Sequence, residues 1–246
     1  MIEIFIAIDN NFSNHWEHVF NSIKANTKEK ISFNIICESD VKVHVSDANI
    51  NIINVEPQIK QYKKFNLQST RAIYLRWLIP ELTKSDKAVY FDTDVIVLGD
   101  VKELWDIDLK DNYIAAVPSY IFKTVGQGAF IQGGCRESRV RSFLSGQLVM
   151  NCRAWREFKL KDKMIEFALD NNVLDEAPLS IICNGHIHEL SKYWCVPANY
   201  ISDGYKHSQM LYDYDMKRVK LLHWSGPYKP WIKQGRNHEY YKKYIS

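Results

Sequence analysis

Apolar residues along the chain fall into blocks whose spacing predicts strands alternating with helices. The apolar run Ile2–Ile8 ends at Asp9, which predicts a strand followed by a polar loop. The next apolar residues recur at i, i+3, i+4 and i+7 and predict a helix with one buried face: Trp16, Val19, Phe20 and Ile23. Ser13 is the expected N-cap of that helix.

The rest of the chain continues this alternation. Further strands are predicted over Ile31–Cys37, Ile50–Val55, Lys87–Phe91, Tyr113–Val117, Gln147–Met150 and Val219–His223. Helices are predicted over Ser69–Leu82 and Ala154–Leu169, whereas the glycine-containing stretch Ser119–Ser142 predicts a long flexible loop. Strands alternating with helices indicate an α/β fold with a mainly parallel central sheet and helices on both faces.

Polar residues follow three of the predicted strands directly, at Asp9–Asn11, Asp92–Asp94 and His223–Lys229. Ligands of sheets of this kind bind at the carboxyl ends of the strands. These three segments are therefore the candidates for a functional site.

Composition and charge restrict the class of protein. With 246 residues, 46% of them hydrophobic, the chain is expected to form one domain. Its 32 basic and 29 acidic side chains give a net charge of +3. This small excess does not indicate a nucleic-acid binder, and we expect no nucleic-acid partner.

Location and redox state follow from the apolar runs and the cysteines. No apolar run approaches the roughly 18 to 20 residues that a membrane-spanning helix needs. The N-terminal run lacks the features of a signal peptide, so a cytoplasmic location is expected. No C-x-x-C spacing occurs, and the cysteines are expected to be reduced and mostly buried: Cys37, Cys135, Cys152, Cys183 and Cys195.

Asp92-Thr93-Asp94 lies between two apolar runs, Ala88–Phe91 and Val95–Gly99. On a continuing strand the two carboxylates would point to opposite sides, so a shared ion requires the backbone to turn there. The alternative is that one aspartate caps a turn and the other is solvated. The flanking apolar residues place the acids in the core layer, where an unpaired charge is costly, and this favours a metal site.

His223 opens a second polar segment, which contains Ser225-Gly226 and Lys229. A Ser-Gly turn lets backbone N–H groups approach an anion, and the lysine adds a positive charge. A hydrogen-bonded structural histidine is the alternative. Two carboxylates and one imidazole suit Mn²⁺ or Mg²⁺ and leave positions for phosphate oxygens, so the combination indicates a metal-diphosphate site.

These pieces, in this order, resemble glycosyltransferase family 8, which includes the glycogenins and bacterial lipooligosaccharide galactosyltransferases. The matching segments span almost the whole chain: Ala7–Phe12, Tyr74–Trp77, Tyr90–Val95, Ser145–Asn151 and His223–Trp231. The resemblance implies a GT-A fold and transfer of a hexose from a UDP-sugar with retention at the anomeric carbon, using Mn²⁺, with Mg²⁺ as the alternative ion.

The resemblance also implies roles for individual positions. Asp92, Asp94 and His223 would bind the metal, Asp92 would also lie near the ribose, and Thr93 would belong to the nucleotide-sugar site. Gly226 and Lys229 would hold the diphosphate, and Arg76 would lie near the donor sugar. The uridine would be held by Ala7, Ile8, Asp9, Asn11 and Phe12, with Asp9 as the partner of the uracil and Phe12 as its stacking surface.

The chain departs from the family pattern in two places. Leu144-Ser145-Gly146 stands where relatives have Asn before a small residue and Gly, so one polar contact to the donor sugar is lost while Ser145 and Gly146 stay in the expected site. Asp175-Glu176-Ala177 stands where relatives have Asp-Gln-Asp. Asp175, Glu176 and Arg76 are the candidate catalytic residues. Attack by a carboxylate and attack by the acceptor from the face of departure both stay open.

The expected activity is transfer of glucose or galactose from UDP to a saccharide or a lipid-linked glycan, in the synthesis of lipopolysaccharide or capsule. One alternative is a non-catalytic sugar-nucleotide binding module. An aspartyl phosphatase is a second alternative, but the later acidic cluster that it would need is not evident in the sequence.

We expect a catalytic domain over residues 1–227 and a basic aromatic tail over 228–246. The tail has five basic residues against Glu239 alone, a charge of +4. Its interleaved aromatic rings favour peripheral contact with the inner face of an anionic membrane. The alternative is a tail that packs back on the domain.

Overall fold

The computed structural model describes residues 1–38, 40–45, 47, 49–55, 72–132, 136, 138–200, 214–232 and 237–245. Within them, the main sheet has seven strands in the order β3-β2-β1-β4-β7-β6-β8. Six run in one direction, and β7 is antiparallel to β4 and β6, so the mainly parallel sheet is confirmed. The strands are β1 (Ile2–Ile8), β2 (Ile31–Glu38), β3 (Ile50–Val55), β4 (Lys87–Phe91), β6 (Ile114–Pro118), β7 (Phe143–Asn151) and β8 (Ile187–Glu189).

A second, three-stranded sheet supplies the rest of the site. It consists of β5 (Val95–Val97), β10 (Leu221–His223) and β9 (Val196–Pro197). The central strand β10 is antiparallel to β5 and parallel to β9. Because β5 follows β4 after three residues, the chain passes from one sheet to the other at Asp92–Asp94.

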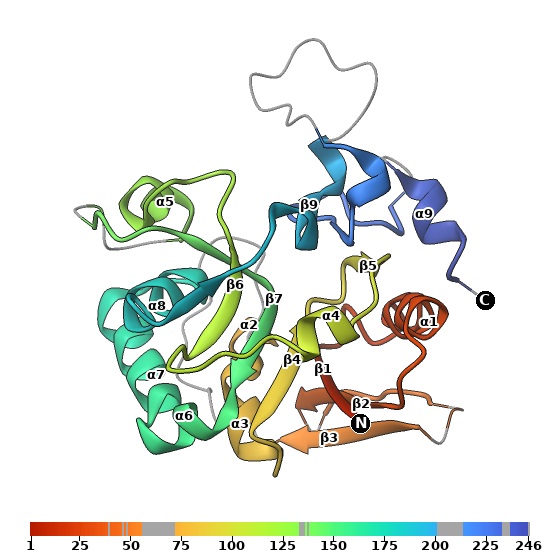
Figure 1. The fold of residues 1–246 in the computed structure, drawn as a ribbon, viewed down its shortest axis with the longest axis horizontal. Helices are drawn as coiled ribbons and strands as arrows, with labels where there is room; N and C mark the ends of the chain where they lie inside the picture. The colour runs from red at the N-terminus through yellow and green to blue at the C-terminus, as the bar shows by residue number, and fades with distance from the viewer. Residues whose placement is uncertain are drawn as a thin grey trace.

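Helices cover both faces of the main sheet, as expected (Figure 1). One hydrophobic cluster packs residues of α6, α7 and α8 against one face, and a second packs α1 and α4 against the other. The helices are α1 (Glu17–Asn26), α2 (Ala72–Leu75), α3 (Ile79–Leu82), α4 (Lys102–Trp105), α5 (Val125–Gln132), α6 (Cys152–Glu157), α7 (Leu160–Asn171), α8 (Glu176–Ile182) and α9 (His238–Lys242).

Helix α1 begins later than its expected cap. Trp16 occupies the N-cap position, and Ser13 donates its hydroxyl hydrogen to the carbonyl of Asn10 instead. The preceding loop is held by Oδ1 of Asp9, which accepts from the backbone N–H groups of Asn11 and Phe12. These turns delay the helix until Glu17.

Both longer predicted helices are interrupted. Within Ser69–Leu82, the residues before Ala72 lie outside the described part, and a 3₁₀ turn over Arg76–Leu78 separates α2 from α3. Pro80 has no N–H to donate to the carbonyl of Arg76, so the α-helix cannot run through. Within Ala154–Leu169, Lys159 has a φ of 51° and separates α6 from α7.

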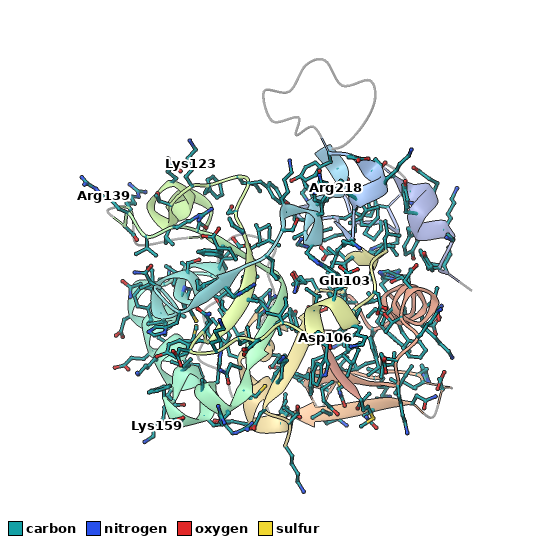
Figure 2. All side chains as sticks on the ribbon, in the orientation of Figure 1. Glu103, Asp106, Lys123, Arg139, Lys159 and Arg218 are labelled. Carbon is teal, nitrogen blue, oxygen red and sulfur yellow. The ribbon has the colours of Figure 1, made fainter. Side chains whose placement is uncertain are left out.

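The stretch Ser119–Ser142 is not a structureless loop. It contains α5, and an isolated β-bridge joins Thr124 to Arg141. Lys123 and Arg139 project outward from this segment, and Lys159 projects from the opposite end of the molecule (Figure 2). Strands β5, β8 and β9 were not predicted.

The tail packs against α1 in the residues that the structure describes. Tyr241 and Tyr244 are buried in a third hydrophobic cluster with residues of β9 and β10. Asn21 donates to the carbonyl of Tyr244 at 3.0 Å, and Asn26 donates to its hydroxyl at 3.3 Å. The rings of Tyr241 and Tyr244 are therefore part of the hydrophobic core.

Two further expectations concern thiols and membrane spans. All four cysteines in the described part are buried and unbridged, as expected, and Cys135 lies outside it. None of the helices described is long and apolar enough to cross a bilayer.

Candidate active site

The turn Asp92–Asp94 joins the two sheets and is held by backbone contacts at each residue. The N–H of Asp92 donates to the carbonyl of Gly146 on β7 at 2.9 Å, and the carbonyl of Asp94 accepts from Trp224 N–H at 2.9 Å. The backbone turn that a shared ion requires is therefore present.

His18 of α1 holds the middle of this turn. Its Nε2 lies 2.8 Å from the carbonyl of Thr93. Burial lowers the pKa of His18 to about 4, so the ring is neutral at pH 7 and donates from Nε2. Sequence reasoning missed this residue, because it lies on the buried face of a helix 75 residues away in sequence.

Asp92, Asp94 and His223 converge. One ligand atom from each lies within 4.8 Å of the others, and this is the only such group of His, Cys, Asp or Glu in the part of the chain that the structure covers. The Nε2 atom of His223 lies 3.1 Å from Asp94 Oδ1 and 3.6 Å from Asp92 Oδ2. Two carboxylate oxygens and an imidazole nitrogen are a donor set suited to Mn²⁺ or Mg²⁺.

Charge partners set the ionisation of these groups. Burial alone would raise the pKa of Asp94, but Lys229 and His223 together hold it well below its usual range. Burial alone would lower the pKa of His223, but Asp94 raises it well above the ordinary value. Lys229 Nζ lies 2.5 Å from Asp94 Oδ2, so this lysine reaches the acidic pair.

Arg76 is a buried connector rather than a solvated helix charge. Its side chain is 3% exposed and pairs with Asp92 Oδ1 at 2.9 Å and Asp175 Oδ2 at 3.2 Å. It also donates to the carbonyl of Ser145 at 2.6 Å. Burial alone would lower its pKa, but the carboxylates of Asp175 and Asp92 raise it above the ordinary value.

Asp175 and Glu176 lie at the start of α8, beside Arg76. Burial raises the pKa of Asp175 despite its ion pair with Arg76. Burial, with the nearby charge of Asp175, raises the pKa of Glu176 to about 7. Oε1 of Glu176 lies 3.5 Å from the backbone N of Ser145. The two candidate catalytic carboxyls thus differ in their surroundings, since Asp175 forms an ion pair with Arg76 and Glu176 lies against the backbone N of Ser145.

A cavity of about 140 Å³ adjoins the acidic pair. Of the expected site residues, it is lined by Ala7, Phe12, Arg76, Asp92, Thr93, Asp94 and Lys229. Ala72, Ile73 and Tyr90 also line it and were not expected. Tyr90 donates to Asp92 Oδ1 at 2.6 Å, a role that its place in an apolar strand did not signal.

The remaining residues that were expected to bind the nucleotide do not line this cavity. The Ile8 side chain is in the core, Asn11 is exposed, and neither lines the cavity. Asp9 Oδ2 is buried and has no hydrogen-bond partner among the described residues. Gly226 adopts a φ of +88°, which only glycine takes readily, so the expected turn after His223 is present.

Comparison with known proteins decides the family. The family model described as glycosyl transferase family 8 matches residues 3–235. The chain belongs to glycosyltransferase family 8. Membership supports glycosyl transfer as the activity and replaces the aspartyl phosphatase interpretation.

The relatives of this family 8 chain differ in length. "Glycosyltransferase 8 domain-containing protein 1" of Danio rerio is 26% identical over 86% of this chain and 68% of its own length. "Glycosyltransferase GlyF" of Streptococcus pneumoniae is 26% identical over 77% of this chain but 45% of its own length. The galactosyltransferase LgtC, solved with donor and acceptor sugar analogues, superposes with a TM-score of 0.77 at 21% identity, covering 98% of this chain and 94% of LgtC. The fold is therefore the GT-A fold.

Proposed function

We propose that this chain is a retaining hexosyltransferase that moves glucose or galactose from a UDP-sugar to a saccharide acceptor, with a divalent ion at Asp92, Asp94 and His223. By analogy with bacterial relatives, the proposed acceptor is a glycan of a surface glycoconjugate, lipopolysaccharide or capsule, either free or lipid-linked. The observation that carries the proposal is the convergence of these three ligands beside the cavity.

The residues present fit Mn²⁺, with Mg²⁺ as the second choice, because hard oxygen ligands and one imidazole lie within reach of a single ion. When bound, such an ion stabilises the negative charge that develops on the departing diphosphate. Lys229 supports the same charge from the protein side, and the turn at Gly226 leaves backbone N–H groups near it.

Asp9 and Phe12 would recognise the uridine. The unpartnered Oδ2 of Asp9 is an acceptor that the uracil N–H would satisfy. Phe12 lines the cavity, and Trp231 meets the Phe12 ring edge-on with centroids 5.4 Å apart, which fixes its orientation. Trp231 itself stacks on His15 at 4.4 Å, so the proposed base site has an aromatic support that the sequence did not reveal.

Retention requires a carboxylate nucleophile or attack from the face of departure. A carboxyl with a pKa of about 7 is about half protonated at pH 7, and its protonated form is a poor nucleophile. Asp175 is engaged by Arg76. We therefore favour attack by the acceptor from the same face, with Arg76, Asp175 and Glu176 shaping the sugar site.

The test is a panel of UDP-sugars incubated with Mn²⁺, with release of UDP as the readout. We expect release with UDP-glucose or UDP-galactose, and its loss in Asp94→Asn and His223→Ala with the fold retained. Donor binding without release, in the presence of acceptor saccharides, would support the binding module instead. Normal turnover in either variant would contradict the metal assignment.

A further inference from the structure

A metal-binding histidine needs a partner on the nitrogen that does not face the ion. The ring binds through the lone pair of one nitrogen, so the other nitrogen carries the proton and must donate it to an acceptor, which fixes the tautomer and the ring plane. In His223, Nε2 faces Asp94 and Asp92. Nδ1 faces away from them and lies 3.5 Å from the Sγ atom of Cys195.

The backbone before and after Cys195 fixes the position of this residue. It follows the 3₁₀ turn Lys192–Trp194, and its N–H donates to the carbonyl of Lys192 at 3.3 Å. It precedes β9, whose Pro197 pairs with His223. The thiol is fully buried, so its position relative to the ring is set by the backbone of the second sheet.

Gly146 confines the same ring from the main sheet. A Cβ atom at this position would lie 2.5 Å from Cε1 and 2.8 Å from Nδ1 of His223, closer than real contacts allow. The imidazole therefore fits between β7 and the thiol without room to turn over. This close approach gives Gly146 a role at the ring, in addition to the sugar contact expected from the sequence.

We propose that Cys195 is a positioning residue for His223. Its sulfur accepts a hydrogen bond from the Nδ1–H group of His223 and thereby directs the Nε2 lone pair between Asp92 and Asp94. The inference rests on the proposed function, because it assumes that His223 binds a divalent ion. Among the described residues, Cys195 is the partner that the structure places on Nδ1. Cys195 does not touch the ion or the donor in this role.

Two substitutions separate the acceptor role from packing. Cys195→Val keeps an apolar side chain of similar size and removes the acceptor, whereas Cys195→Ser keeps an acceptor and makes the site more polar. The dissociation constant for Mn²⁺ is measured on the full chain without donor, by electron paramagnetic resonance at one fixed pH, with the melting temperature recorded alongside. Cys183→Ser is the matched control, because Cys183 is also fully buried but lies in the first cluster.

We expect Cys195→Val to weaken Mn²⁺ binding about 10- to 100-fold, the range typical of lost partners of metal ligands. Cys195→Ser should stay within about fivefold of the wild type, and Cys183→Ser should bind Mn²⁺ as the wild type does. In the Mg²⁺-loaded wild type, imidazole ¹⁵N resonances should report the Nδ1–H tautomer of His223.

Wild-type affinity in Cys195→Val, or equal losses in Cys195→Val and Cys195→Ser, would overturn the positioning role while leaving the metal site intact. A wild-type chain that binds no divalent ion would overturn the proposed metal site, and the role of Cys195 with it. The two failures are distinguishable because the wild-type measurement is made first.

Discussion

Arg76 joins Asp92, in the turn between the two sheets, to Asp175 at the start of α8. It is nine-tenths or more buried, and it contacts two carboxylates and a backbone carbonyl. Its guanidinium also lies over the ring of Tyr90, 4.6 Å from the centroid. A lysine cannot make this planar set of contacts, so the usual conservative replacement is not conservative here.

The first prediction is that Arg76→Lys lowers the free energy of unfolding by about 3 to 5 kcal/mol, because it leaves Asp175 buried without its partner. Urea unfolding measures this loss. The double variant Arg76→Lys/Asp175→Asn should recover part of it, since the stranded charge is then gone. If the losses in free energy of unfolding from the two substitutions simply add, the ion pair between Arg76 and Asp175 contributes no coupling energy.

Glu176 gives a pH-dependent prediction. The pKa of Glu176 is about 7 in the folded protein against an ordinary value of 4.5, so the folded state holds this proton to higher pH than the unfolded chain does. The stability it contributes is complete below pH 4.5 and is lost as the pH rises through 7. Glu176→Gln should therefore match the wild type near pH 4 and exceed it by up to about 3 kcal/mol above pH 7.

Thermal or urea unfolding across this pH range tests the effect, and UDP release by the same variant tests the mechanism. Substantial activity in Glu176→Gln agrees with attack from the same face. Near-complete loss of transfer with the fold intact would instead identify Glu176 as the nucleophile.

Among the elements, α1 has a role beyond packing, because His18 ties it to the Asp92–Asp94 turn. The pKa of His18 falls from 6.5 to about 4 on folding, so the folded state binds fewer protons. Its contribution is present above pH 6.5 and is lost as the pH falls through 4, a loss of up to about 3 kcal/mol.

His18→Gln keeps an N–H donor for the Thr93 carbonyl but cannot be protonated. We expect this variant to lose the acid-sensitive part of the stability curve between pH 6.5 and 4 and to retain Mn²⁺ binding. His186→Gln is the control, because His186 stacks on Tyr113 away from the site. An unchanged acid slope in His18→Gln would show that the ring does not titrate on unfolding.

The elements that were predicted correctly are those with a local signal. Strands β1 to β4 are rich in isoleucine, valine and aromatic residues, and α1 has a clear helical period. The break at Lys159 depends on a left-handed residue that has no sequence mark, and β5, β8 and β9 are two or three residues long and owe their pairing to distant partners. The other break, between α2 and α3, could have been predicted from Pro80.

The same division applies to the site. Asp92, Asp94 and His223 were found because each lies at or just after the end of a strand, and ligands collect at strand ends. His18 and Cys195 were not found, since each acts through a single tertiary contact that no spacing announces. The expected contacts between individual side chains and the nucleotide stay predictions.

For the molecule as a whole, peripheral membrane binding of the tail stays a prediction, and the structure reduces the number of tail residues that could contact a membrane. Tyr241 and Tyr244 are buried, so removing the tail would damage the third cluster rather than test a surface. The exposed cations Lys242 and Lys243 are the better target. Each cation near an anionic surface contributes about 1 kcal/mol, so Lys242→Ala/Lys243→Ala should weaken binding about tenfold or more.

Sedimentation with anionic and neutral vesicles, at low and high salt, measures this effect. The control is Lys159→Ala/Lys163→Ala, which removes the same charge from a distant surface; Lys159 lies far from α9 (Figures 1 and 2). Equal binding by the two double variants would assign any membrane affinity to overall charge. No binding of the wild type to anionic vesicles would end the proposal.

The placement of the metal ligands on two sheets has a consequence for biosynthesis. Asp94 and His223 are separated by about 130 residues, and β10 follows every strand of the main sheet in sequence. At translation rates of about 5 to 20 residues per second, the acidic pair emerges roughly 6 to 25 s before its histidine. Throughout that interval a nascent chain carries Asp92 and Asp94 without the third ligand. On the proposed metal assignment, ribosome-bound chains should therefore acquire the divalent ion only after His223 has emerged and the second sheet has formed.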